Sequence, residues 1–165
     1  MEDVGGSSEE FVSAFETAFA RVQIAVEEAS ARHREWPLRI AAAIRAGLEF
    51  AAADPAAANV LTNEAIAAGP DGIARYRRLT TYIAEAFAGG REQGSGDGEP
   101  PQVTEQALAG GLLGLVAERL NAGRAAELPA LAPEAIEFTL TPYLGTAEAK
   151  RIASLAGRPG SGPER

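Results

Sequence analysis

Apolar side chains recur every three or four residues along most of this chain, which constrains the fold more than any other feature. Between Phe11 and Val26 the repeat places three phenylalanines and two valines on one side of a helix. Hydrophobic residues make up 46% of the sequence and aromatic residues only 6%, since alanine supplies much of the apolar content. Alanine loses no side-chain entropy in a helix. The sequence therefore predicts an all-α fold, a bundle of about six to seven helices.

Capping and breaking residues divide the pattern into separate helices. Ser8 can cap the first helix, Pro37 suits the first turn of the second, and Asp54 can cap the third. Gly69 and Pro70 end the third helix. The expected helices span residues 8–32, 37–53, 55–68, 71–88, 104–122 and 133–144, with a last short one over 146–155.

One helical domain is expected over residues 8–156, between a flexible N-terminus at 1–7 and a disordered tail at 157–165. Within it, residues 89–103 predict a flexible loop, because glycine and proline are too dense there to sustain a helix. Arg91 lies in this loop, so replacing it with alanine is expected to leave folding and assembly unchanged.

Composition excludes several classes of function. The chain has no cysteine and one histidine, His33, so disulfides, thiolate metal sites and a two-histidine metal site are ruled out, and no cofactor is expected. A net charge of −8 disfavours binding to nucleic acid. No apolar run reaches the roughly 18 residues of a membrane span, so no membrane partner and a cytoplasmic location are expected.

Candidate catalytic groups do not form a plausible set. His33 lies among charged residues at a helix end and is expected to face solvent. The neighbouring pairs Glu9-Glu10 and Glu27-Glu28 point to different helix faces, so neither forms an acid/base dyad. The chain is therefore expected to act by binding rather than as an enzyme.

The segment 104–122 carries apolar residues on more than one face, together with Gly110, Gly111 and Gly114. Each glycine costs a helix about 1 kcal/mol relative to alanine, which suggests that a partner approaches closely there. A weak helix without a partner is the alternative. We expect a two-fold homodimer through this helix and the next. The expected interface residues are Leu108, Gly111, Leu112, Leu115, Phe138, Leu140, Tyr143 and Leu144.

Several short motifs, taken in order, resemble TetR-type transcriptional regulators. Residues 36–40 (WPLRI), 48–50 (LEF) and 54–55 (DP) resemble the first helices of the effector domain of that family. The stretches 107–111 (ALAGG), 119–124 (RLNAGR), 128–134 (LPALAPE) and 138–145 (FTLTPYLG) are similar to the C-terminal end of one large TetR subgroup. The similarity extends over about residues 6–153.

This resemblance implies the effector-binding and dimerisation domain of a ligand-responsive repressor. The second to fifth helices would enclose a cavity for a small apolar effector, and the last two long helices would pair with their copies. Glu64, in a largely apolar helix, is either a polar anchor in that cavity or exposed on the surface. The expected ligand-binding residues are Phe50, Leu61, Glu64, Tyr76, Thr80, Ile83 and Leu112; each could instead fill a solid core.

The N-terminal part of the sequence differs from the pattern of TetR-type regulators. Residues 6–11 (GSSEEF) resemble only the tail of the TetR helix-turn-helix domain, and the recognition helix is missing. DNA contact is therefore expected only through a helix-turn-helix that this sequence lacks, because of truncation or true loss. Two alternatives remain open. The protein could be a helical protein without a DNA-binding domain that heterodimerises with a full-length regulator. It could also be a small helical enzyme acting on an apolar substrate.

Overall fold

The computed structural model describes residues 4–94 and 98–156, and these residues form seven helices and no strand, which confirms the predicted all-α bundle. The predicted tail at 157–165 lies outside the described residues. In chain order the helices are α1 (Val4–Ala31), α2 (Trp36–Ala53), a continuous run of α3 (Pro55–Asn59), π-helical η1 (Val60–Glu64) and α4 (Ala65–Ala67), α5 (Gly69–Ala88), α6 (Thr104–Asn121), α7 (Ala132–Leu144) and α8 (Thr146–Ala156). Two 3₁₀ helices, η2 (Gly89–Gln93) and η3 (Ala125–Leu131), precede α6 and α7.

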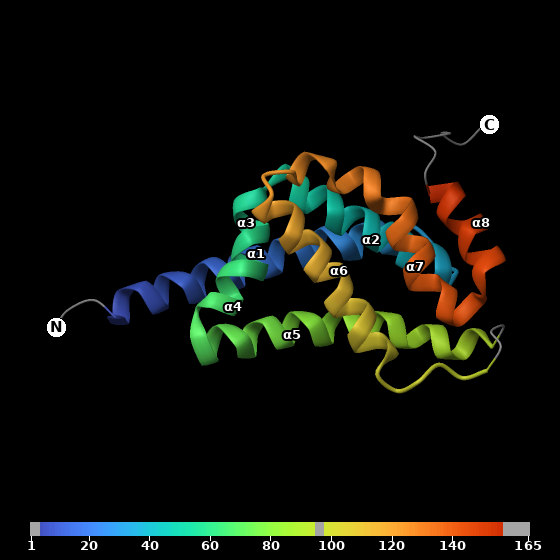
Figure 1. The fold of residues 1–165 in the computed structure, drawn as a ribbon, viewed down its shortest axis with the longest axis horizontal. Helices are drawn as coiled ribbons and strands as arrows, with labels where there is room; N and C mark the ends of the chain where they lie inside the picture. Colours follow the sequence, from blue (N-terminus) through green and yellow to red (C-terminus); the bar gives the residue numbers. More distant parts are fainter. Residues whose placement is uncertain (1–3, 95–97, 157–165) are drawn as a thin grey trace.

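The helices form one body, with the first turns of α1 projecting beyond the other helices (Figure 1). In that view α6 crosses α5, and α7 and α8 lie at the end opposite the N-terminus. None of the helices within the described ranges has both the length and the hydropathy that a membrane span requires.

The predicted capping of the third helix is confirmed, whereas that of the first is wrong. The Asp54 carboxylate accepts a hydrogen bond from the Ala57 backbone nitrogen at 3.0 Å and so caps α3. Ser8 caps nothing, because α1 already begins at Val4 and Ser8 lies inside it.

The third predicted helix contains a π-helical turn that was not predicted from the sequence. In this turn the Thr62 hydroxyl donates to the carbonyl oxygen of Ala58 at 2.8 Å. A π turn is wider than an α turn, so it changes which residues face inward, and such turns are frequent at functional sites. Here both Leu61 and Thr62 are buried.

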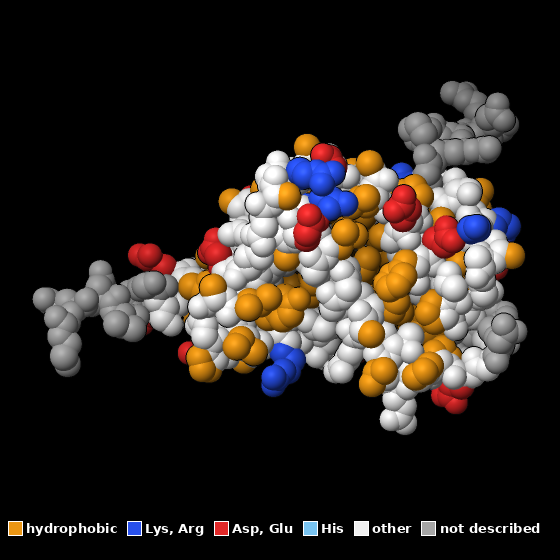
Figure 2. Space-filling model, in the orientation of Figure 1, with side chains coloured by type: hydrophobic (Ala, Val, Ile, Leu, Met, Phe, Trp, Pro, Cys, Tyr) orange, Lys and Arg blue, Asp and Glu red, His pale blue; other side chains and the backbone are white. Residues whose placement is uncertain are grey.

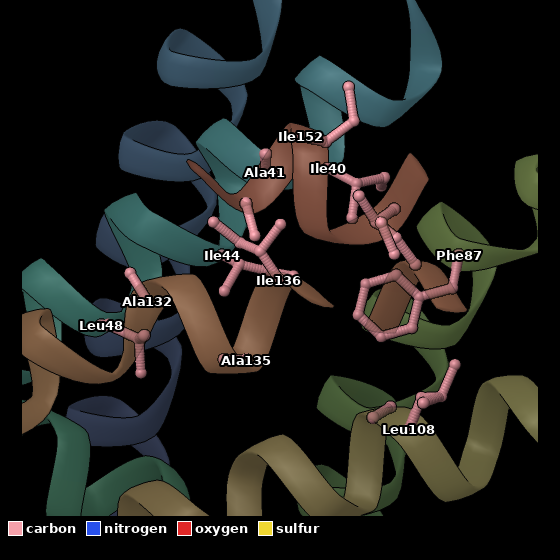
Figure 3. Packing of buried hydrophobic residues seen from close by; sticks show 14 of the residues in the cluster. Ile40, Ala41, Ile44, Leu48, Phe87, Leu108, Ala132, Ala135, Ile136 and Ile152 are labelled. Carbon is pink, nitrogen blue, oxygen red and sulfur yellow. The ribbon is translucent and has the colours of Figure 1, made fainter. Parts of the chain in front are cut away.

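The core consists of two clusters of buried side chains rather than one. The larger cluster joins α2, α7 and α8, with Phe87 from α5 and Leu108 from α6 packing against it (Figure 3). The smaller cluster is built on Phe15 and Phe19 of α1 and includes residues from η1, α5 and α6. Phe15 and Phe19 of the first predicted stripe are therefore core residues, and Phe11 packs against them partly buried.

The segment after α5 is more ordered than the predicted flexible loop, because residues 89–93 form the 3₁₀ helix η2. Arg91 anchors this segment. Its Nε and one terminal nitrogen donate to the two oxygens of the buried Glu105 carboxylate, both at 2.8 Å. It also donates to the carbonyl oxygens of Pro100 and Pro101 at 2.9 and 2.8 Å. The sequence suggested that Arg91 could be replaced without effect on folding. Its ion pair with Glu105 indicates instead that Arg91 stabilises the fold.

The same ion pair is joined to the aromatic packing around η2. The Tyr143 hydroxyl donates to Glu105 at 3.0 Å, and its ring meets that of Trp36 edge-on, with centroids 5.3 Å apart. The Trp36 Nε1 in turn donates to the carbonyl oxygen of Ala86 at 3.0 Å. These contacts tie the starts of α2 and α6 to the ends of α5 and α7.

Candidate ligand cavity

A cavity of about 490 Å³ lies between the two core clusters. It is bounded by α1 and α2 on one side and by α5 and α6 on the other, with α3 and η1 closing one end. Its size falls within the range of about 300–1,000 Å³ that is typical of small-molecule sites. The lining residues are Val22, Val26, Glu27, Ser30, Ala31, Arg39, Ile40, Ala43, Ile44, Gly47, Leu48, Phe50, Ala51, Ala58, Leu61, Thr62, Leu79, Tyr82, Ile83, Ala86, Phe87, Leu112, Leu113 and Val116.

Four of the seven residues expected to bind a ligand line this cavity. They are Phe50 on α2, Leu61 on η1, Ile83 on α5 and Leu112 on α6. Four elements far apart in the sequence thus contribute to one apolar enclosure.

The other three expected residues do not line the cavity. Glu64 is exposed and accepts a hydrogen bond from the Asn59 side chain at 2.8 Å, so it is not an inward anchor. Tyr76 is half-buried against the smaller core cluster, one turn before the first α5 residue of the lining. Thr80 donates its hydroxyl to the Tyr76 carbonyl oxygen at 3.0 Å. Tyr76 shares the α5 face of Leu79, Ile83 and Phe87 but lies before the point where the cavity begins.

Charged and polar side chains gather where α1 ends and α2 begins. Glu27 and Ser30 come from the last turns of α1, and Arg39 from the first turn of α2. Tyr82 faces them from α5 and donates its hydroxyl to Glu27 at 3.0 Å. Burial, with the nearby Glu27 carboxylate, raises the pKa of Tyr82 to about 12, so the phenol is neutral at physiological pH.

The contribution of α1 to the wall was missed by sequence reasoning, which expected only the second to fifth helices to enclose the cavity. Along its stripe the phenylalanines give way to the smaller Val22 and Val26, and the facing side of α2 carries Ala43, Gly47 and Ala51. Small side chains at four-residue spacing on one helix, opposite valines on its neighbour, leave unfilled volume. This pattern could have located the cavity.

The expected dimer residues fall into two groups in the structure. Leu108, Leu140, Tyr143 and Leu144 are buried in the core of the chain itself, and Leu112 lines the cavity. Packing of α7 against α2 and α8 buries the three α7 residues, while Leu108 and Leu112 of α6 face the core and the cavity. These five side chains therefore have little surface to offer a partner in this conformation.

The remaining expected dimer residues lie on an outer face of α6 and α7, where Figure 2 shows hydrophobic side chains. Phe138 is 58% exposed, Gly111 is exposed, and Leu115 is half-buried. A side chain at Gly110 or Gly114 would meet nothing of its own chain within 4 Å. Crowding within the chain therefore does not explain these two glycines. We call this surface, formed by residues 110, 111, 114, 115 and 138, the α6–α7 face.

No protein-family model, curated protein or solved structure matches this chain. Chemically, the cavity has a mostly apolar wall with one arginine, one carboxylate and two hydroxyl groups near one end. Within residues 4–94 and 98–156, no three His, Cys, Asp or Glu side chains are grouped to hold a metal ion. This arrangement suits the binding of an organic ligand.

Proposed function

We propose that this chain is the effector-binding and dimerisation domain of a TetR-type, ligand-responsive transcriptional regulator, and that the cavity holds a small, largely apolar effector. The cavity carries the proposal. It lies between two packed clusters, it has the size of a ligand site, and its wall is mostly aliphatic and aromatic. The motif similarity supplies the class of regulator.

The size of the cavity argues against a mere packing defect. Voids larger than a water molecule are few in a close-packed protein interior. This cavity is partly open to solvent, and its mostly apolar wall offers water few hydrogen-bonding partners. An apolar ligand fills such a space better than water does.

An effector would act through the helices that it touches. A ligand shifts a conformational equilibrium only by its difference in affinity for the two states. Here it would contact α1, α2, α5 and α6 together, so it would favour the arrangement of these helices that fits it. In a TetR-type regulator this conformational shift would change the arrangement of the DNA-binding domains. The net charge of −8 argues against direct DNA binding by the residues of this chain.

The α6–α7 face supports the homodimer in this proposal. Exposed Phe138 and the half-buried Leu115 would be covered by a copy of the same face, and the glycines would allow its backbone to approach closely. A heterodimer with a full-length regulator would use the same surface. Sedimentation of the purified chain distinguishes the two, because only self-association gives a homodimer.

Thermal unfolding with a panel of lipophilic compounds tests the effector site. A ligand at 100 times its dissociation constant stabilises the fold by about 2.7 kcal/mol, which raises the melting temperature of a chain this size by roughly 5–10 °C. In Ala43→Phe the new ring would occupy the cavity, so the variant should fold but show no shift. Ala53→Phe, an exposed position on the same helix outside the lining, is the control and should keep the shift. A panel without any shift in the wild-type protein would remove the support for this function.

A further inference from the structure

We infer that the ligand of this cavity is an amphiphile with a carboxylate head, which pairs with Arg39 at the rim, and an apolar tail that extends toward η1 and α6. This inference rests on the proposed ligand site and names the chemistry of its occupant. It is drawn from where the polar groups of the lining lie and from which of them lack a partner.

The polarity of the lining is unequal along its length. The charged lining residues Glu27 and Arg39 both come from the region where α1 passes into α2. At the other side, η1 and α6 contribute Leu61, Leu112, Leu113 and Val116. Thr62 is the polar residue there, and its hydroxyl proton is directed to the Ala58 carbonyl oxygen within its own helix. A bound molecule therefore meets one polar end and one apolar end.

Arg39 has unused hydrogen-bonding capacity at the polar end. A guanidinium carries five N–H donors, four of them on its terminal nitrogens. The side-chain hydrogen bond of Arg39 in the described part of the chain runs from Nε to the Ser30 hydroxyl, and it is long, at 3.4 Å. Among the described residues no carboxylate lies within ion-pair distance of it. The terminal nitrogens are thus available for a bidentate contact, which a carboxylate fits best.

The carboxylate at this rim has a protein partner. Glu27 accepts the Tyr82 hydroxyl at 3.0 Å, a hydrogen bond that a neutral phenol donates well to a charged carboxylate. The contrast with Arg39 favours an anionic head group. An anionic head gives Arg39 the ionic partner that it lacks, whereas Glu27 already accepts one hydrogen bond from the protein.

The length of the wall fits an extended tail. On α2 the lining runs from Arg39 to Ala51, which is about 18 Å at a rise of 1.5 Å per residue. A linear alkyl chain of ten or more carbons could lie along that wall. Each buried methylene should then tighten binding by about fourfold, until the tail reaches the closed end.

Calorimetric titration with three matched probes tests this inference: dodecanoate, dodecanol and dodecylammonium, each below its micelle concentration. In the wild-type protein dodecanoate should bind most tightly. In Arg39→Gln its affinity should fall by about tenfold or more, the loss expected for hydrogen bonds to a charged group at a partly solvated rim. The affinity for dodecanol should stay within about twofold. Arg34→Gln, an exposed neighbouring arginine outside the lining, controls for general surface charge and should retain dodecanoate binding.

The outcomes separate this inference from the function on which it rests. Dodecanol binding with no preference for dodecanoate, or equal dodecanoate affinities for wild type and Arg39→Gln, would overturn the carboxylate assignment and leave the apolar site standing. A preference for dodecylammonium that disappears in Glu27→Gln would reverse the sign of the head group. Failure of all three probes to bind, with no compound of the lipophilic panel giving a thermal shift, would overturn both.

Discussion

Replacing Gly90 with alanine should destabilise the protein through a steric conflict that the structure locates. Gly90 is buried in η2, and a Cβ there would lie 2.5 Å from Cη2 of Trp36 and 2.6 Å from Cδ1 of Tyr143. Real Cβ atoms essentially never come that close to a neighbour, so one of the rings must move. Trp36 is held by its hydrogen bond to Ala86 and Tyr143 by its hydrogen bond to Glu105. Neither ring can withdraw without losing a partner.

The magnitude follows from these two effects. Overpacking by one methyl group typically costs 1–3 kcal/mol, and weakening the bond from Tyr143 to the Glu105 carboxylate adds to it. Because the two costs overlap, we expect the free energy of unfolding of Gly90→Ala to fall by roughly 2–4 kcal/mol. For a chain of this length that lowers the melting temperature by roughly 4–16 °C.

Urea unfolding followed by circular dichroism measures the change, with Gly47→Ala as the matched control. A Cβ at Gly47 would lie 3.9 Å from Cγ1 of Val26, an ordinary contact, and the position is inside α2. That substitution should therefore stabilise the protein by about 1 kcal/mol. The reasoning is refuted if Gly90→Ala unfolds at the urea concentration of the wild type, or if both alanine variants lose stability equally.

Three further predictions follow from the same contacts and from the α6–α7 face. Arg91→Ala should lower the melting temperature because it leaves the buried Glu105 carboxylate without its cation, whereas alanine at the exposed neighbour Glu92 should not. Although burial opposes the shift, hydrogen bonds from Arg91, the backbone and Tyr143 lower the pKa of Glu105. Its stabilising effect should be present at pH 7 and be lost as the pH falls below about 4, so the stability difference between wild type and Tyr143→Phe should shrink in acid. Gly114→Ala should raise the stability of an isolated monomer by about 1 kcal/mol but weaken a dimer that packs on this helix, which sedimentation and thermal unfolding together would show.

The spacing of apolar residues was sufficient to predict the all-α fold and most helix positions. The prolines at 37, 55 and 133 lie in the first turns of α2, α3 and α7, because proline lacks only a hydrogen bond that this turn does not need. Asp54 was found for the same local reason. Such signals depend on neighbours in sequence, which a single chain displays directly.

The cavity and the contacts of Arg91 depend on residues far apart in sequence and were harder to predict. Leu61 and Ile83 were found because their apolar stripes had to face inward, but the same argument wrongly included Tyr76, which lies one turn too early. Arg91 looked solvated because its partner, Glu105, is 14 residues away across a glycine-rich segment. A single sequence does not show which acidic residue such an arginine will meet.

Ligand binding and dimerisation should influence each other, because both proposed surfaces include α6. One side of this helix lines the cavity through Leu112, Leu113 and Val116, and its outer side carries Gly111 and Gly114. A ligand that displaces α6 must alter the α6–α7 face, and thermodynamic linkage then requires the dimer to bind the ligand with a different affinity from the monomer. The dimer dissociation constant, measured by sedimentation, should therefore change when dodecanol is added at saturation, and Ala43→Phe should abolish that response. An unchanged dissociation constant in the presence of a bound ligand would show that α6 transmits nothing between the two surfaces.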